Sequence, residues 1–108
     1  MLPKKYRISV KEGDFVFKEG KHIISPNLTF KFVLTHRSIF PRISFIAPKN
    51  IAKLAVKRNL LRRRGYCALE KHIKDFPFGL IGAFVFKKSE EDVSIIENEI
   101  KNILSKIN

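Results

Sequence analysis

The sequence has little cysteine, few acidic side chains and no long apolar run. Its single cysteine excludes an intrachain disulfide framework and a cysteine-rich zinc site. The longest nearly continuous apolar run, from Leu80 to Phe86, is far too short to span a bilayer. The basic N-terminus is not followed by an apolar stretch of signal-peptide length. We therefore expect a soluble, cytoplasmic protein of a reducing compartment.

Catalytic motifs are missing as well. The three histidines are scattered, and no His-Glu-x-x-His, Gly-x-Ser-x-Gly or phosphate-binding glycine loop is present. Glu90, Glu91 and Asp92 cluster, but capping of a helix explains them. Cys67 is interpreted as an inert, partly buried thiol. If the chain takes part in catalysis, we expect another molecule to supply the reactive groups.

Positive charge is what the sequence has in excess. The 108 residues carry 22 Lys and Arg against 10 Asp and Glu, a net charge of +12. Residues 49–74 alone hold nine of the basic side chains and one acid, Glu70. Such an imbalance predicts a polyanionic partner. A helix on a membrane surface needs bulky apolar side chains opposite its basic face, and this segment has neither Trp nor Phe, so nucleic acid is favoured over a membrane.

Hydrophobic periodicity predicts a single domain over residues 1–108 that mixes strands and helices. A short β-branched segment covers Lys21 to Ser25, and alternation of apolar side chains indicates a strand from Leu28 to Thr35. A second alternating run extends from Arg42 to Ala47. The segment from Leu80 to Phe86 is apolar on both faces, which predicts a strand buried in the middle of a sheet.

Two helices complete the predicted order. The first is expected from Ile51 to about His72, with Asn50 as its N-cap and with Gly65 as a flaw that costs about 1 kcal/mol relative to Ala. The second is expected to start at a Ser89 N-cap and carries an apolar helical stripe. Three strands, a helix, a strand and a helix predict an α+β two-layer sandwich with the helices on one sheet.

The charge on the first predicted helix is one-sided. From Ala55 to Arg64 there is no acid, and like charges at this density destabilise an isolated helix unless phosphates neutralise them. A helical wheel places Arg58 and Arg62 on the same arc as Ala55 and Leu69. Two arginines on the arc that faces the core indicate a helix that overhangs its sheet or lines a cleft.

Phenylalanine is the second abundant feature, with ten in the chain and no tryptophan. Phe45, Phe84 and Phe86 lie in predicted strands and are assigned to the core. Phe15 and Phe17 lie between two glycines and are harder to place. Aromatic side chains beside a basic surface can stack on unpaired bases. They can equally close one end of the core, and the sequence leaves both interpretations open.

Several motifs now stand together: Asp14-Phe15-Val16-Phe17, the run from Pro41 to Lys49, Ala55, and Arg58-Asn59-x-x-Arg62-Arg63. Together they resemble the protein component of bacterial ribonuclease P. The sequence departs from that family's pattern at several positions: Leu60 and Tyr66 stand where it has Arg, and Asn50 stands where it has Lys. Arg62 stands where it has Lys, and Pro48 stands where a small residue is usual. The chain is identified as a divergent member.

The resemblance implies a fold and a role. The fold is ribonuclease P protein-like, also found in a ribosomal protein domain: a mixed four-stranded sheet with helices and a left-handed β-α-β crossover, where the general rule is right-handed. The role is that of an accessory subunit in a ribonucleoprotein endonuclease, which binds the catalytic RNA and the 5′ leader of precursor tRNA. In this family the RNA and its Mg²⁺ ions perform the hydrolysis, so no catalytic residue and no bound metal are expected in this chain.

On this basis we expect the catalytic RNA to meet eight side chains: Lys49, Lys53, Lys57, Arg58, Asn59, Arg62, Arg63 and Arg64. We expect the single-stranded leader to meet Phe15, Phe17, Lys31 and Val33. The expected partners are the catalytic RNA and precursor tRNA, with no membrane and no obligate protein partner. Two alternatives use the same basic helix. One is a non-catalytic, ribosome-associated or other structured-RNA binding protein, and the other is a DNA-binding module, for which no helix-turn-helix or zinc spacing is present.

Overall fold

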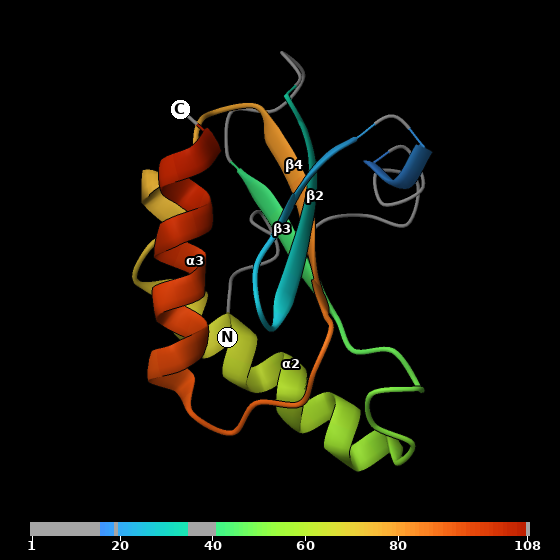
Figure 1. The fold of residues 1–108 in the computed structure, drawn as a ribbon. Helices are drawn as coiled ribbons and strands as arrows, with labels where there is room; N and C mark the ends of the chain where they lie inside the picture. Colours follow the sequence, from blue (N-terminus) through green and yellow to red (C-terminus); the bar gives the residue numbers. More distant parts are fainter. Residues whose placement is uncertain (1–15, 19, 35–40, 108) are drawn as a thin grey trace.

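The computed structural model describes residues 16–18, 20–34 and 41–107 of the chain. Residues 16–18 are helical, and the elements after them are β1 Lys21–Ile24, β2 Leu28–Leu34, β3 Arg42–Ile46, α2 Ala55–Glu70, the short 3-10 helix η2 Ile73–Asp75, β4 Leu80–Phe86 and α3 Val93–Ile107 (Figure 1). This order confirms the predicted succession of three strands, a helix, a strand and a helix. Within the described ranges, neither α2 nor α3 has the length and apolarity needed to cross a membrane.

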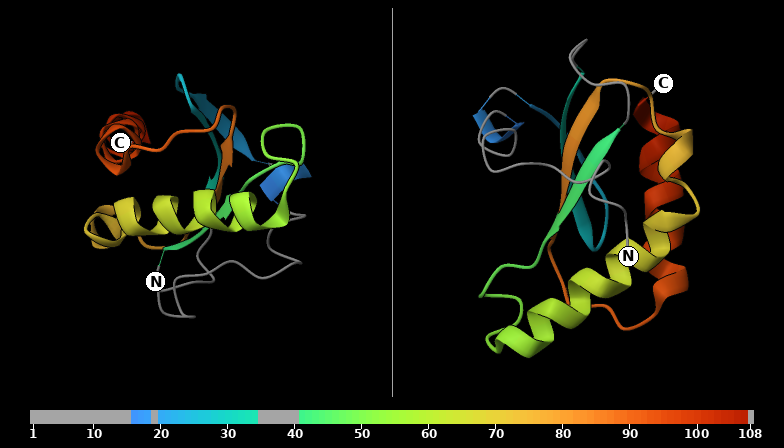
Figure 2. Two further views of the ribbon diagram at one scale, coloured as in Figure 1. Left: turned by 90° about the horizontal axis from the view of Figure 1, so that it is seen from below. Right: turned by 180° about the vertical axis from the view of Figure 1, so that it is seen from behind.

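The four strands form one mixed sheet in the order β1-β2-β4-β3. β2 pairs antiparallel with β1 and with β4, whereas β3 runs parallel to β4 and is joined to it through α2. Figures 1 and 2 show α2 and α3 on one face of the sheet and the helical residues 16–18 on the other. With the helices toward the viewer and β3 and β4 pointing up, β4 lies to the left of β3, so the crossover is left-handed, as the resemblance implies.

Stacked phenylalanines form the centre of the core. The strand register places Phe84 between Phe30 and Phe45, with ring centroids 4.2 Å and 5.0 Å apart. Phe86 is also buried, so the assignment of the strand phenylalanines to the core is confirmed. α3 covers these rings with the apolar stripe predicted from its sequence, through Ile96, Ile100 and Ile103.

The start of α2 differs from the prediction. The helix begins at Ala55, four residues later than expected, and Asn50 is not its N-cap. The carbonyl oxygen of Pro48 accepts hydrogen bonds from the backbone N–H groups of Ile51 and Ala52, at 3.1 and 3.2 Å, and so closes a separate turn. Leu54 then takes the cap position with an extended backbone and no side-chain cap. The apolar period continued across this turn and therefore hid it.

Gly65 and Tyr66 fix the approach of α2 to the edge of the sheet. A Cβ atom at Gly65 would lie 2.5 Å from the ring of Phe45, so the glycine permits close packing and is more than a flaw in the helix. The Tyr66 hydroxyl accepts a hydrogen bond of 3.2 Å from the backbone N–H of Phe45, and the two rings meet edge to face. Since β3 is an edge strand, this contact satisfies a backbone donor that no strand pairs.

α3 begins at Val93, and the predicted Ser89 cap is wrong. Asp92 caps the helix instead, because its carboxylate accepts a hydrogen bond of 2.8 Å from the Ser94 backbone N–H. Further along α3, the carboxylate of Glu99 is only 6% exposed and accepts hydrogen bonds from both the backbone and the side chain of Asn27, at 2.8 and 2.6 Å. This buried carboxylate ties the turn between β1 and β2 to the helical layer.

Candidate nucleic-acid interface

The basic side chains of α2 lie on a part of the helix that has few protein neighbours. The first turns of α2 extend beyond the end of the sheet (Figures 1 and 2). Six of the eight side chains predicted to meet the catalytic RNA are exposed there or in the preceding turn: Lys49, Lys53, Lys57, Asn59, Arg62 and Arg63. The stretch from residue 49 to 69 contains no acid, so no side chain within it compensates the positive charges.

Arg58 and Arg64 are half-buried and use part of their guanidinium groups inside the protein. Nη1 of Arg58 donates to the carbonyl oxygens of Ala52 and Lys53, at 3.1 and 2.8 Å, and so holds the segment that leads into α2. Nη1 of Arg64 donates to the carbonyl oxygen of Glu90, at 3.2 Å, and joins α2 to the segment before α3. Both arginines therefore position the basic helix in addition to adding charge to it.

The wheel prediction was right for Arg58 and wrong for Arg62 and Ala55, which are exposed. The buried residues of α2 are Leu61, Gly65, Ala68 and Leu69. Because the helix packs against α3 as well as β3, its buried arc is rotated away from Arg62. Ala55 is exposed because the first turn of α2 extends beyond the sheet. The choice between an overhanging helix and a cleft is thus settled in favour of the overhang.

Asn59 and Arg62 contact each other on the exposed face, where Nη2 of Arg62 donates to the side-chain oxygen of Asn59. This hydrogen bond holds the guanidinium group along the helix and leaves its other N–H groups directed at solvent. Arg63 lies next to this pair and is also exposed. A guanidinium group held in this way is suited to a bidentate contact with phosphate.

Leu60 and Tyr66, the two positions in α2 where the family has Arg, have different surroundings. Leu60 is 45% exposed and lies on the overhang with two other exposed apolar side chains, Leu54 and Val56. Tyr66 is half-buried and bonds to β3 as described above. An aromatic hydroxyl is therefore used for packing at Tyr66, whereas Leu60 leaves an uncharged position within the basic face.

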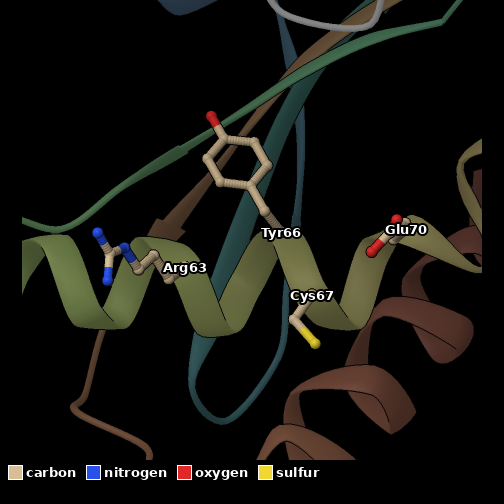
Figure 3. Close-up of a pocket in the computed structure, with 4 residues that line it drawn as sticks. All are labelled: Arg63, Tyr66, Cys67 and Glu70. Atoms are coloured by element: carbon tan, nitrogen blue, oxygen red, sulfur yellow. The ribbon is translucent and has the colours of Figure 1, made fainter. Parts of the chain in front are cut away.

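A shallow depression of about 390 Å³ lies along the second half of α2, lined by Arg63, Tyr66, Cys67 and Glu70 (Figure 3). Tyr66 points toward β3, and the Cys67 thiol points away from it. Cys67 is exposed, so the expectation of a partly buried thiol was wrong. Cys67 precedes the buried Ala68 and Leu69 in sequence, but its side chain is not on the buried face of α2. The sequence did not predict this depression, because only Arg63 of its four lining residues belongs to a recognised motif.

The side chains predicted to meet the leader lie on the other face of the sheet. The Phe17 ring is 43% exposed, and Nζ of Lys31 lies 5.0 Å from its centroid, a cation–π contact. Val33 points to the same side of β2 as Lys31, and both are half-buried. Phe15 lies outside the described residues. Phe17 is therefore exposed and does not form part of the buried core, and its contact with bases stays a prediction.

Gly20 sets the position of Phe17 relative to the sheet. Its backbone N–H donates to the carbonyl oxygen of Val16, at 2.8 Å, and a Cβ atom here would lie 2.3 Å from that oxygen. Val16, the first of the helical residues, is fully buried, whereas Phe17 beside it is exposed. Glycine thus permits the sharp return of the chain from the helical residues into β1 and leaves the aromatic ring over Lys31.

Comparison with known proteins bears on what these two surfaces serve. A sequence model of the family described as Ribonuclease P matches residues 2–108. The chain belongs to the ribonuclease P family. A ribonuclease P protein component from Pseudanabaena sp. (strain PCC 6903) is 26% identical over 110 residues, which cover 98% of this chain and 94% of that protein.

Solved structures of ribonuclease P proteins share the fold. The protein from Thermotoga maritima superposes with a TM-score of 0.81 at 18% identity, over 94% of this chain and 97% of the other. A Staphylococcus aureus ribonuclease P protein mutant, described as defective in mRNA degradation activity, gives 0.81 at 17% identity, over 96% and 89%. The predicted fold and family resemblance are therefore confirmed. Family membership makes the chain a protein component of the ribonucleoprotein endonuclease that matures the 5′ end of tRNA.

Proposed function

We propose that the chain binds the catalytic RNA of ribonuclease P through the exposed basic face of α2, and the 5′ leader of precursor tRNA through the open face of the sheet. The observation that carries the proposal is the overhang of α2. It exposes Lys49, Lys53, Lys57, Asn59, Arg62 and Arg63 without an acidic side chain among them. A protein surface of this kind attracts and screens RNA phosphates.

The contacts inside the protein divide this surface into two kinds of residue. Arg62 and Arg63 point into solvent and act directly on phosphate, whereas Arg58 and Arg64 also hold the helix in place. A rigid array of donors binds phosphate with less loss of side-chain freedom than flexible lysines do. We therefore assign Arg62 and Arg63 the largest direct contribution to RNA affinity.

The leader is proposed to lie across the sheet face that carries Phe17, Lys31 and Val33, with Phe15 beside them in sequence. An aromatic ring accepts the face of any base, and a nearby lysine attracts the sugar–phosphate backbone. Lys31 lies over Phe17, so both features occur at one place. Such a site favours a single strand of any sequence over a duplex, because duplex bases present no free face.

Phosphodiester hydrolysis is assigned to the RNA and to Mg²⁺ that the RNA holds. The described residues contain no group of three or more His, Cys, Asp or Glu side chains arranged to hold a metal ion. Metal-bound water supplies the nucleophile in such reactions without a protein base. We further propose a cytoplasmic location, which suits the exposed free thiol of Cys67.

Reconstitution tests the proposal. The protein is mixed with the catalytic RNA of the same source and a labelled precursor tRNA at low Mg²⁺, and release of the 5′ leader is followed with and without protein. We expect protein-dependent cleavage at the mature 5′ end, and tighter precursor binding as the leader grows by a few nucleotides. If an RNA that is active alone at high Mg²⁺ gains nothing from the protein, or if leader length has no effect, a general binder of structured RNA replaces the proposal.

A further inference from the structure

The turn that leads into β4 carries an aromatic side chain that neither proposed surface uses. Phe78 is 77% exposed, the most of any large apolar side chain described. Leu34, at 61%, ends β2 and pairs in register with Leu80, so a second exposed apolar side chain lies at the same end of the sheet. The overhanging start of α2 lies toward the opposite end of the molecule (Figure 1).

The backbone around Phe78 is held on both sides. Leu80 donates its backbone N–H to the carbonyl oxygen of Pro77, at 3.3 Å, and Gly79 has a φ of 80°, which glycine adopts readily in a tight turn. Before the turn, Phe76 is buried against the rings of Phe30 and Phe84. The core thus anchors Phe76, and the turn presents Phe78 to solvent in a fixed place. Little conformational freedom is left to lose when a partner binds.

The charges near this turn favour an anionic partner. Lys71 and Lys74 are exposed just before it. The last eight residues of α3, 100–107, contain two lysines and no acid. That end of α3 lies at the same end of the molecule as the turn (Figure 1). The acidic residues 90–92 precede α3 at its other end. Three acids also lie on this side of the helical layer: Glu70 beside Lys71, Glu97, which contacts His72, and Asp75, whose carboxylate lies 3.9 Å from Nδ1 of His72.

We propose that Phe78 is a stacking site for one unpaired nucleobase of an RNA bound by this protein. The proposal rests on the proposed function, which supplies the RNA, and adds a contact at the end of the molecule away from the basic overhang. The exposed faces of Phe78 and Leu34 are too small for a stable protein–protein interface, which needs about 1,000 Å². A nucleobase matches a single ring in size, and the surrounding lysines attract its phosphates.

The chain has no tryptophan, so a single introduced indole reports on this turn alone. In the Phe78→Trp variant we expect the fluorescence to be strongly quenched when catalytic RNA or precursor tRNA is added, because an indole stacked on a base is quenched. Ile95→Trp is the matched control: Ile95 is an exposed apolar residue in the first turn of α3, beside acidic residues, and its indole should keep its emission. Equal responses of the two variants would overturn the proposal.

Affinity measurements with Phe78→Ala identify the RNA concerned. Catalytic RNA alone, precursor tRNA alone and the assembled complex are titrated separately, and the RNA that supplies the base should bind about tenfold more weakly. The dependence of affinity on salt should not change, because no charge is removed. Unchanged affinity for every RNA would refute stacking while leaving the proposed function intact, since that is tested by leader release. A dimer of the wild-type protein that Phe78→Ala converts to monomers would refute stacking in favour of a second copy of the chain.

Discussion

α2 and α3 lie side by side on one face of the sheet and have almost the same length, 16 and 15 residues, yet their surfaces are opposite in character. α3 is amphipathic, and its apolar stripe is buried in the core. α2 buries a single narrow arc, two members of which are Gly65 and Ala68, and leaves charged or polar side chains over most of its circumference.

The difference separates stability from binding. Burial of large aliphatic side chains makes α3 and the strands the main source of folding free energy. α2 gains less from burial and is held by specific contacts, such as Tyr66 with Phe45 and Arg64 with Glu90. Because the outer face of α2 does not pack in the core, it can carry like charges that repel one another but attract an anionic partner. Substitutions in the two helices should therefore affect different measurements.

The largest effect is expected from the double reversal Arg62→Glu and Arg63→Glu. Both side chains are exposed, so the free energy of unfolding should change little, while RNA affinity should fall by at least about 100-fold because each charged hydrogen bond contributes roughly 1.5–3 kcal/mol. Lower salt dependence of the residual binding should accompany the loss. Filter binding to the catalytic RNA at several salt concentrations measures both quantities.

Lys87→Glu with Lys88→Glu is the matched control, since it changes the net charge equally at exposed positions after β4. If the control weakens RNA binding as much as the α2 variant does, overall charge and not the face of α2 governs affinity. That result would remove the distinction between the two helices.

The next largest effect concerns stability and sharpens the comparison from the other side. Ile100 of α3 is fully buried, and Ile100→Ala should lower the free energy of unfolding by about 2–5 kcal/mol. Leu60→Ala, the same kind of truncation on the exposed face of α2, should change it by less than about 0.5 kcal/mol. Urea unfolding followed by circular dichroism compares them. Similar losses in the two variants would show that the outer face of α2 also contributes to the fold.

Much of the fold was predictable from local patterns. Alternation located β2 and β3, a nearly continuous apolar run located β4, and the helical stripe located α3. The phenylalanines of the strands were correctly placed in the core. The helix starts were not, because the apolar period ran on through the turn closed by Pro48, and because Asp92 caps α3 where Ser89 looked equally suitable in sequence.

The candidate site was predictable in composition but not in detail. One-sided charge pointed to the basic helix without any knowledge of its neighbours. The contacts of Arg64 with Glu90 and of Tyr66 with Phe45 join residues 26 and 21 positions apart, and no periodicity encodes such pairs. Exposure of Phe78 likewise depends on where its turn lies relative to the sheet. Local sequence therefore predicts which side chains are available, while tertiary contacts decide which of them are already in use.

The smallest predicted effect lies at the junction of the two helices. Glu97 of α3 accepts a hydrogen bond from Nε2 of His72, just beyond α2, at 2.9 Å. This hydrogen bond, more than the nearby positive charges, lowers the pKa of the Glu97 carboxyl below its usual range. A carboxyl whose pKa is lower in the folded than in the unfolded chain stabilises the fold above the unfolded value and loses that contribution as pH falls through the folded value.

Acidification should therefore weaken the contact between the two helices, with the loss beginning near the ordinary pKa of a glutamate and complete below the folded pKa of Glu97. In Glu97→Gln, which keeps a hydrogen-bond acceptor but has no carboxyl to titrate, the urea midpoint should fall less steeply with decreasing pH than in the wild type. Unfolding at a series of pH values between 7 and 3 measures the difference. Identical slopes would mean that the junction of α2 and α3 depends on packing alone, because the ionised form of Glu97 would then contribute nothing that acid removes.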